Sequence, residues 1–100
     1  KDVVRDKLAR AQTKVSLAQN YTYYVAWLDA QGADCIKEVS MLKAYACDIA
    51  NEVMYDCLQL HGGMGFMSES PIERMYRDAR VLTIGGGATE VMYGEVAKRM

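Results

Sequence analysis

Three consecutive stretches of the sequence decide the fold: QLHGGMGF over residues 59–66, SPIERMYRDAR over 70–80 and IGGGATEV over 84–91. The first contains glycines, which have no β-carbon and adopt the left-handed conformation that stops a helix. The second begins with serine and proline, which are favoured at the N-cap and the first position of a helix. The third places three successive glycines before the last segment. These stretches therefore predict a helix end, a short helix, a loop and a final helix.

The sequence before residue 59 predicts two longer helices. On the first, apolar and small residues recur at alternating steps of four and three, as expected for one buried face. That face comprises Val4, Leu8, Ala11, Val15, Ala18, Thr22 and Val25, and a second stripe of Leu17, Tyr21, Tyr24 and Leu28 broadens it. Gly32 ends this helix, and Asp34 is placed to cap the next one. The face predicted for the second helix comprises Ile36, Val39, Leu42, Ala46, Ile49, Val53, Cys57 and Leu60.

The third helix is expected to begin with a capping box, in which Ser70 caps, Pro71 takes the first position and Glu73 bonds back. Gly85 to Gly87 break this helix, and a fourth runs over residues 88–100. Short connections between helices favour antiparallel neighbours. The sequence therefore predicts an all-α protein, an up-and-down four-helix bundle, with residues 1–100 forming a single domain.

Composition excludes several classes of function. The chain is 51% hydrophobic with one proline, which argues against disorder. The net charge is -1, from 12 basic and 13 acidic residues, so nothing indicates a nucleic-acid or acidic-membrane partner. No apolar run is long enough to span a bilayer.

The thiols and the histidine indicate no metal site. Cys35, Cys47 and Cys57 have a spacing that matches neither a zinc site nor a redox pair. His61 is the only histidine, so a multi-histidine metal site is excluded. We expect reduced thiols packed as small hydrophobic groups.

The order and spacing of the motifs over residues 59–100 resemble the C-terminal helical domain of the acyl-CoA dehydrogenases, a family of flavoenzymes. The resemblance covers the whole chain and implies FAD as cofactor and an acyl-CoA as substrate. It also implies a homo-oligomer, with a tetramer favoured, and an electron-transfer acceptor as partners. The compartment implied is the bacterial cytoplasm or the mitochondrial matrix.

The resemblance also assigns binding residues in two segments. The first would reach across a subunit interface to the ADP part of the partner's FAD, through Gln59, Leu60, His61, Gly62 and Gly63. In the second segment Gly86 and Gly87 would border the substrate, while Ala88, Thr89 and Glu90 would lie beside FAD. Without the resemblance, the first segment is a helix C-cap with a tight turn and the second is a flexible glycine loop. For His61 we expect a partly buried, hydrogen-bonded side chain rather than a catalytic one.

The chain departs from the commonest family pattern at the catalytic base. Many members carry a glutamate where this chain has Gly86, which cannot accept a proton. The IGGGATEV variant resembles the long-chain and isovaleryl branches, which carry the base on an earlier helix. The resemblance therefore implies no catalytic residue within this chain. For Arg74, Arg77, Asp78 and Arg80 we expect structural or interface roles, with Arg74 and Asp78 paired at helical spacing.

Two other functions remain open at this point. Flavin monooxygenases and nitroalkane oxidases share this fold, so the chemistry of the parent enzyme differs in that case. A non-catalytic helical assembly domain, pairing through apolar faces, is the second alternative. The tyrosines of the first helix (Tyr21, Tyr23 and Tyr24) are expected to present at least one ring to a neighbouring domain or subunit.

Overall fold

The computed structural model describes residues 2–100, which form four α-helices in the predicted order. These are α1 (Asp2–Ala30), α2 (Ile36–His61), α3 (Pro71–Ala79) and α4 (Thr89–Lys98). Two short 3-10 helices, η1 (Gly62–Phe66) and η2 (Arg80–Thr83), continue from the C-terminal ends of α2 and α3. Residues 2–100 contain no β-strand, which confirms the all-α class.

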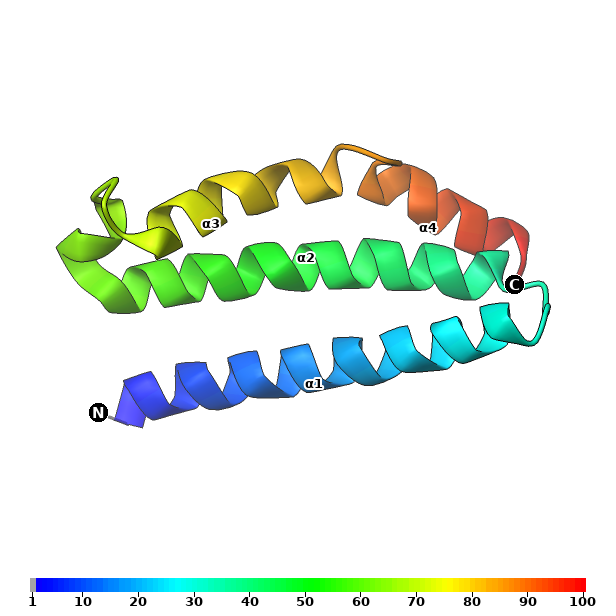
Figure 1. Ribbon diagram of the computed structural model, residues 1–100, viewed down its shortest axis with the longest axis horizontal. Coiled ribbons are helices and arrows are strands. Elements are labelled where there is room, and N and C mark those ends of the chain that lie inside the picture. Colours follow the sequence, from blue (N-terminus) through cyan, green and yellow to red (C-terminus); the bar gives the residue numbers. More distant parts are fainter. Residues whose placement is uncertain (1) are drawn as a thin grey trace.

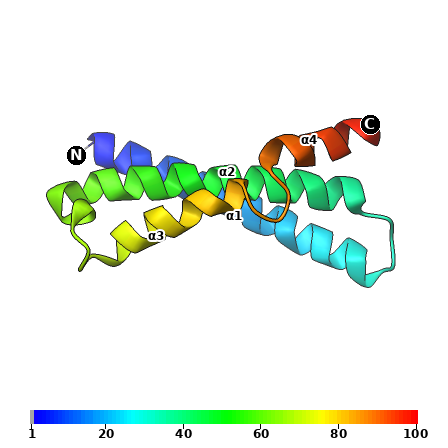
Figure 2. The ribbon, with the colours of Figure 1, turned by 90° about the horizontal axis from the view of Figure 1, so that it is seen from above.

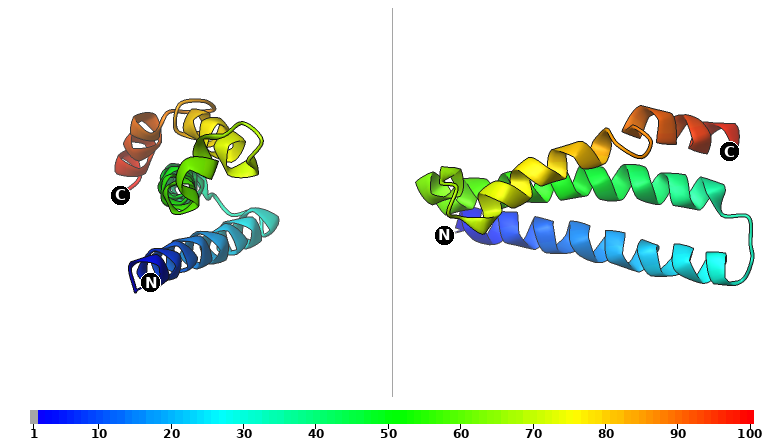
Figure 3. Two further views of the ribbon diagram at one scale, coloured as in Figure 1. Left: turned by 90° about the vertical axis from the view of Figure 1, so that its left-hand side faces the viewer. Right: turned by 45° about the horizontal axis from the view of Figure 1, so that its top comes forward.

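The central element is α2, and the other helices pack around it (Figure 1). Helix α1 runs antiparallel along one side of α2. On the opposite side, α3 and α4 follow one another along α2, lying on either side of its axis (Figures 2 and 3). The result is an elongated up-and-down arrangement with extents of 46 × 27 × 22 Å. The loop between η2 and α4 therefore lies above the middle of α2 (Figure 1).

The predicted breaks occur at the glycines. Gly32 has φ 73° and follows α1, while its N–H donates to the Asp29 carbonyl over 3.0 Å. Gly62 has φ 63° at the C-cap of α2 and donates its N–H to the Gln59 carbonyl. Both conformations are costly for residues with a β-carbon. The three glycine-marked interruptions predicted from sequence are confirmed.

The predicted capping bonds are not formed as expected. Ser70 occupies the N-cap of α3 with Pro71 following, but no side-chain cap hydrogen bond exists there. The Glu73 carboxylate instead accepts a hydrogen bond from Nε of Arg77 over 2.6 Å. The Ser70 N–H, which the capping box would use, is already donated to the Met67 carbonyl over 3.0 Å, which explains the difference. Asp34 lies just outside α2, and its Oδ1 is 3.4 Å from the Ile36 nitrogen, at the long end of hydrogen bonding.

The core follows α2, with contributions from α1 and α3. Its buried apolar and polar side chains are Val25, Cys35, Ser40, Ala44, Ile49, Val53, Ile72 and Ala79. Ala44 is fully buried at 0% exposure. Ser40 and Ala44 lie outside the face predicted for α2, because this helix is covered from more than one side and a single stripe does not describe it.

The contact face of α1 is rotated from the prediction. Val4, Leu8 and Val15 are exposed, whereas Lys7 and Lys14 lie beside α2. Their ammonium groups pair with Asp56 over 3.7 Å and with Glu52 over 3.1 Å. Helix α1 therefore exposes apolar side chains on both sides of its contact with α2, among them Leu8 and Leu17.

Among residues 2–100, no helix combines the length and the apolar character that crossing a membrane requires.

Candidate functional site

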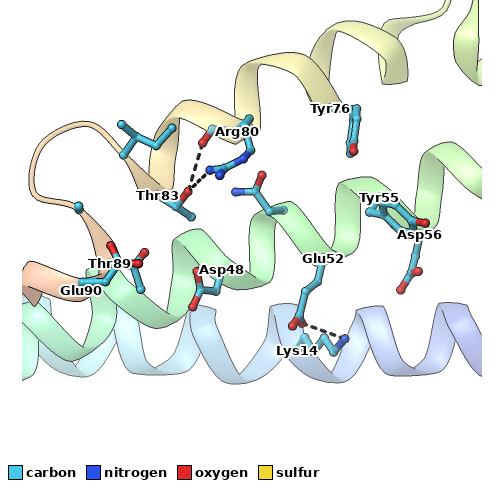
Figure 4. Close-up of a pocket in the computed structure, with 13 residues that line it drawn as sticks. Lys14, Asp48, Glu52, Tyr55, Asp56, Tyr76, Arg80, Thr83, Thr89 and Glu90 are labelled. Atoms are coloured by element: carbon cyan, nitrogen blue, oxygen red, sulfur yellow. Dashed lines mark hydrogen bonds and ion pairs between the residues drawn. The ribbon is translucent and has the colours of Figure 1, made fainter. Parts of the chain in front are cut away.

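The principal hollow of the chain is an open cavity of about 920 Å³. It lies over the middle of α2, with α1 below and the segment from α3 to α4 above (Figure 4). Its floor is mostly α2, its upper wall comes from α3 and η2, and the start of α4 closes one end. The lining residues are Lys14, Asp48, Asn51, Glu52, Tyr55, Asp56, Tyr76, Arg80, Thr83, Ile84, Ala88, Thr89 and Glu90.

Charges of both signs line this cavity. Glu52 is paired with Lys14, and Asp56 is paired with Lys7 of α1. Asp48, Glu90 and Arg80 have no ion-pair partner within residues 2–100. Because Arg80 has no carboxylate neighbour, its charge is available to a ligand in the cavity.

Arg80 and Thr83 form a small hydrogen-bonded unit in the upper wall. Nη1 of Arg80 donates to Oγ1 of Thr83 over 2.6 Å, and the Thr83 hydroxyl donates to the Arg80 carbonyl over 3.2 Å (Figure 4). Asn51 fixes the wall to α2, because its amide nitrogen donates to the Cys47 carbonyl over 3.0 Å and to the Ala79 carbonyl over 2.8 Å. These bonds hold the end of α3 and the start of η2 over the cavity.

The glycine loop leads into this cavity at the N-terminus of α4. Gly86 has φ 67° and Gly87 has φ 105°, both in the region that favours glycine. A β-carbon on Gly87 would lie 2.6 Å from Cε of Met92, whereas one on Gly86 would meet nothing within 4 Å. The loop at Gly86 is therefore open on the side where a side chain would project.

Backbone donors are left free along this loop. Within residues 2–100, the N–H groups of Gly86, Gly87 and Ala88 have no acceptor. The first N–H groups of α4 also lack partners within the helix, and no side chain caps it. Oγ1 of Thr89 is buried without a hydrogen-bond partner among the described residues. Such a run of donors at a helix N-terminus favours anionic or carbonyl oxygen atoms.

Lys43 holds the loop from below. Its Nζ donates to the carbonyl oxygens of Leu82 over 2.7 Å, of Gly85 over 2.9 Å and of Gly87 over 2.6 Å. Three acceptors use all three donors of an ammonium group. Lys43 is not among the site residues predicted from sequence. The signal that could have indicated it is a lysine between Leu42 and Ala44 on a largely apolar helix.

The first predicted binding segment lies elsewhere. Gln59 to Gly63 lie at the far end of α2, and none of these residues lines the cavity. At a rise of 1.5 Å per residue, Gln59 is about 16 Å along the helix from Asp48. The structure thus places Ala88, Thr89 and Glu90 in the lining of the cavity, with Gly86 and Gly87 in the adjoining loop, and keeps Gln59 to Gly63 out of that lining.

At this far end the surface is exposed. Nδ1 of His61 is hydrogen-bonded to the Cys57 carbonyl over 2.7 Å, as expected, but the side chain is exposed rather than partly buried. A β-carbon at Gly65 would lie 3.2 Å from Cβ of His61, so η1 approaches the base of this side chain while the residue as a whole stays exposed. No heavy atom lies within 4 Å of the β-carbon positions of Gly62 and Gly63, so their backbone is accessible.

The ion pairs of α3 and the three thiols lie outside the cavity lining. Nε of Arg74 lies 3.4 Å from Oδ2 of Asp78, which confirms the predicted pair, and Arg77 pairs with Glu73. Cys35, Cys47 and Cys57 are free thiols. The described part of the chain contains no cluster of three metal-ligating His, Cys, Asp or Glu side chains.

Comparisons with known proteins agree with this arrangement. The family model "Acyl-CoA dehydrogenase, C-terminal domain" matches residues 1–100. The chain is 42% identical over 84 residues to the "Caffeyl-CoA reductase-Etf complex subunit CarC" of Acetobacterium woodii, covering 84% of this chain and 22% of that protein. It is 38% identical to the "Long-chain specific acyl-CoA dehydrogenase, mitochondrial" of Sus scrofa, covering 97% of this chain and 23% of that enzyme.

A solved structure supports the same assignment. The acyl-CoA dehydrogenase from Geobacillus kaustophilus superposes with a TM-score of 0.97 at 33% identity, over 99% of this chain and 26% of that one. The chain thus spans between a fifth and about a quarter of the length of these relatives. The chain belongs to the family of acyl-CoA dehydrogenase C-terminal domains.

Proposed function

We propose that this chain is the C-terminal domain of an FAD-dependent enzyme that interconverts an acyl-CoA thioester and its α,β-unsaturated form. Family membership supports the reaction class. The observation that carries the proposal is the glycine loop, in which unpaired backbone N–H groups and the partnerless Thr89 hydroxyl lie at the start of α4 beside an open cavity.

The residues around the cavity fit the cofactor and the substrate. Ala88, Thr89 and Glu90 lie where the start of α4 meets the cavity and would contact FAD. Gly86 and Gly87 would border the acyl thioester, because the absence of a side chain on Gly86 leaves room beside the loop. Bound FAD supplies the hydride acceptor for the substrate β-carbon.

Polarisation of the thioester carbonyl is the chemical contribution of this chain. A backbone N–H of the loop would donate to the carbonyl oxygen, and the bond would strengthen as negative charge develops on that oxygen after loss of the α-proton. Gly86 has no side chain to accept this proton. By the resemblance to the long-chain and isovaleryl type branches, we propose that the base is a carboxylate supplied by another segment of the enzyme.

The first predicted binding segment would serve a different FAD. Gln59, Leu60, His61, Gly62 and Gly63 lie away from the cavity, on an exposed end of α2. Asp56, three residues before Gln59, still lines the cavity, so this end begins about 5 Å along the helix beyond the edge of the cavity. The family relationship assigns these contacts to the FAD of a partner subunit, in a homo-oligomer that we propose to be a tetramer, and the open backbone at Gly62 and Gly63 is accessible to such a partner.

Exposed apolar side chains support these contacts with other domains and subunits. Leu17 and Trp27 on α1 are 58% and 57% exposed, and Phe66 in η1 is 85% exposed. Monomeric proteins rarely leave large apolar patches uncovered. We propose that the rest of the enzyme covers α1 and the region around η1. By the same family relationship, a separate electron-transfer flavoprotein would exchange electrons with the bound FAD.

The test is to purify the full-length protein that carries this chain and measure its flavin spectrum and turnover. We expect stoichiometric FAD and acyl-CoA-dependent dye reduction, with enoyl-CoA as the product. Because a relative named as a reductase matches, enoyl-CoA reduction by the chemically reduced enzyme is measured in parallel. Bound flavin with no reaction in either direction would favour a monooxygenase or nitroalkane oxidase. A protein that binds no flavin at all would favour a helical assembly domain.

A further inference from the structure

Lys43 is the most unusual charged residue that the proposed function leaves without a role. It is half-buried, and among residues 2–100 it has no carboxylate partner. Its three hydrogen bonds go to backbone carbonyls 39 to 44 residues away, all between the end of η2 and the start of α4. Other lysines with ionic partners, such as Lys98 with Glu95, pair with carboxylates instead.

These bonds fix the orientation of two peptide groups on either side of Gly86. A peptide unit is planar and trans, so the carbonyl of one residue and the N–H of the next point in opposite directions. The Gly85 carbonyl points to Nζ of Lys43, so the N–H of Gly86 points away from it. The Gly87 carbonyl also points to Nζ, so the N–H of Ala88 points away as well.

Glycine alone does not produce this orientation. Gly85 to Gly87 lack β-carbons, so many conformations are open to the loop, and choosing one is entropically costly. Lys43 extends from α2, the central helix, whose neighbouring residue Ala44 is fully buried. The three hydrogen bonds of Lys43 therefore tie the glycine loop to α2, the helix against which the other helices pack.

We propose that Lys43 is a positioning residue that presents the N–H group of Gly86 to the carbonyl oxygen of the bound substrate and the N–H group of Ala88 to the adjoining FAD. This inference rests on the proposed function, because it assumes a thioester carbonyl at the loop. Lys43 itself does not touch the substrate. It acts by holding the carbonyls of Gly85 and Gly87, which belong to the same peptide groups as the N–H groups of Gly86 and Ala88. An oxyanion-type donor contributes most when it is oriented before the reaction begins.

The test compares three variants of the full-length enzyme loaded with FAD. Lys43→Met removes the donors and keeps an unbranched side chain, and Lys43→Arg keeps a cation with different donor geometry. Lys37→Met is the matched control, because Lys37 is a half-buried lysine on the same helix and makes no bond to the loop. Each is assayed for flavin content, kcat, KM and the infrared stretch of an enoyl-CoA labelled with carbon-13 at the thioester carbonyl.

We expect Lys43→Met to lower kcat by about 10- to 100-fold, somewhat less than the loss caused by deleting an oxyanion donor outright. The bound carbonyl stretch should move towards its frequency in water, since polarisation is weakened. Lys43→Arg should restore part of both effects, and Lys37→Met should match the wild type. Amide hydrogen exchange over residues 80–92 should accelerate in Lys43→Met, because the bonds from Ile84 and Gly85 to the Val81 carbonyl loosen.

The outcomes separate the two proposals. A wild-type enzyme without flavin-dependent turnover refutes the proposed function, and the role of Lys43 with it. If the wild type turns over while Lys43→Met retains kcat and the carbonyl frequency, the positioning role alone is refuted. If Lys43→Met fails to retain flavin, the test rests on Lys43→Arg. A wild-type kcat and carbonyl frequency in Lys43→Arg would refute the positioning role, because the guanidinium has a different donor geometry.

Discussion

The two glycine segments of this chain look alike in sequence but are held in opposite ways. The turn at Gly62 to Gly65 is held locally: Gly62 donates to the Gln59 carbonyl, and Gly65 packs against Leu58, seven residues earlier. The loop at Gly85 to Gly87 is held by Lys43, about 40 residues earlier in the sequence. The comparison shows that a glycine-rich motif indicates where a chain turns but not what fixes the turn.

The largest expected effect tests the local turn. A β-carbon on Gly65 would lie 2.6 Å from the Leu58 carbonyl oxygen and 3.0 Å from its Cγ, and backbone atoms do not move aside cheaply. We expect Gly65→Ala to lower the free energy of unfolding by about 2 to 3 kcal/mol. Gly63→Ala is the matched control, since nothing lies within 4 Å of its β-carbon position. Urea denaturation measures both, and equal stabilities would contradict a packed turn.

A smaller loss of stability is expected at Asn51, which fixes the segment that precedes the glycine loop. Asn51 joins α2 to the end of α3 through the Ala79 carbonyl, and Ala79 is buried. Asn51→Ala would leave that carbonyl without this donor, at a cost of about 1 to 2 kcal/mol in unfolding free energy. Thermal denaturation checks this, with the exposed Gln19→Ala on α1 as control. A melting temperature unchanged in Asn51→Ala would show that η2 is held by other contacts.

The loop itself should tolerate a methyl group better than the turn. Gly86 has φ 67° but open space around it, so Gly86→Ala introduces conformational strain and no clash. We expect a loss of about 1 kcal/mol in unfolding free energy. Because no proton transfer is assigned to this side chain, the full-length variant should keep measurable turnover. A collapse of kcat by several orders of magnitude at normal flavin content would contradict a base on another segment.

The smallest effect concerns an ion pair remote from both segments. Hydrogen bonds from Lys98 and Arg99 hold the pKa of the Glu95 carboxyl below its usual value. The folded state therefore binds this proton less tightly than the unfolded state, and the stabilisation exists at neutral pH and disappears as pH falls through the lowered pKa.

The pH dependence can be measured with Glu95→Gln. The melting temperature of this variant should be slightly below that of the wild type at neutral pH. The difference should shrink as the pH falls below the ordinary glutamate pKa of about 4.3 and vanish below the lowered pKa of Glu95. High salt should reduce it as well, since exposed pairs are screened. A difference that grows towards acid pH would reverse the assigned sign.

Much of the fold could be predicted from sequence because its signals are local. The helix breaks follow from glycines that adopt positive φ, and the start of α3 follows from a serine and proline pair. The family assignment rests on the same motifs, and the comparisons confirm it. The predicted helix-capping bonds and the predicted buried face of α1 agree less well with the structure. Local reasoning missed that Glu73 pairs with Arg77, and it placed Val4, Leu8 and Val15 on a buried face that the structure leaves exposed.

The sequence by itself determined where the helices begin and end and which family the chain belongs to, because both depend on neighbouring residues. Only the tertiary structure decided that Ala88 to Glu90 line a cavity over α2 while Gln59 to Gly63 do not. Only the tertiary structure joined Lys43 to the glycine loop. The physical reason is that a lysine has three donors and a long flexible stem, so its partners are set by which carbonyls the packed helices bring within reach.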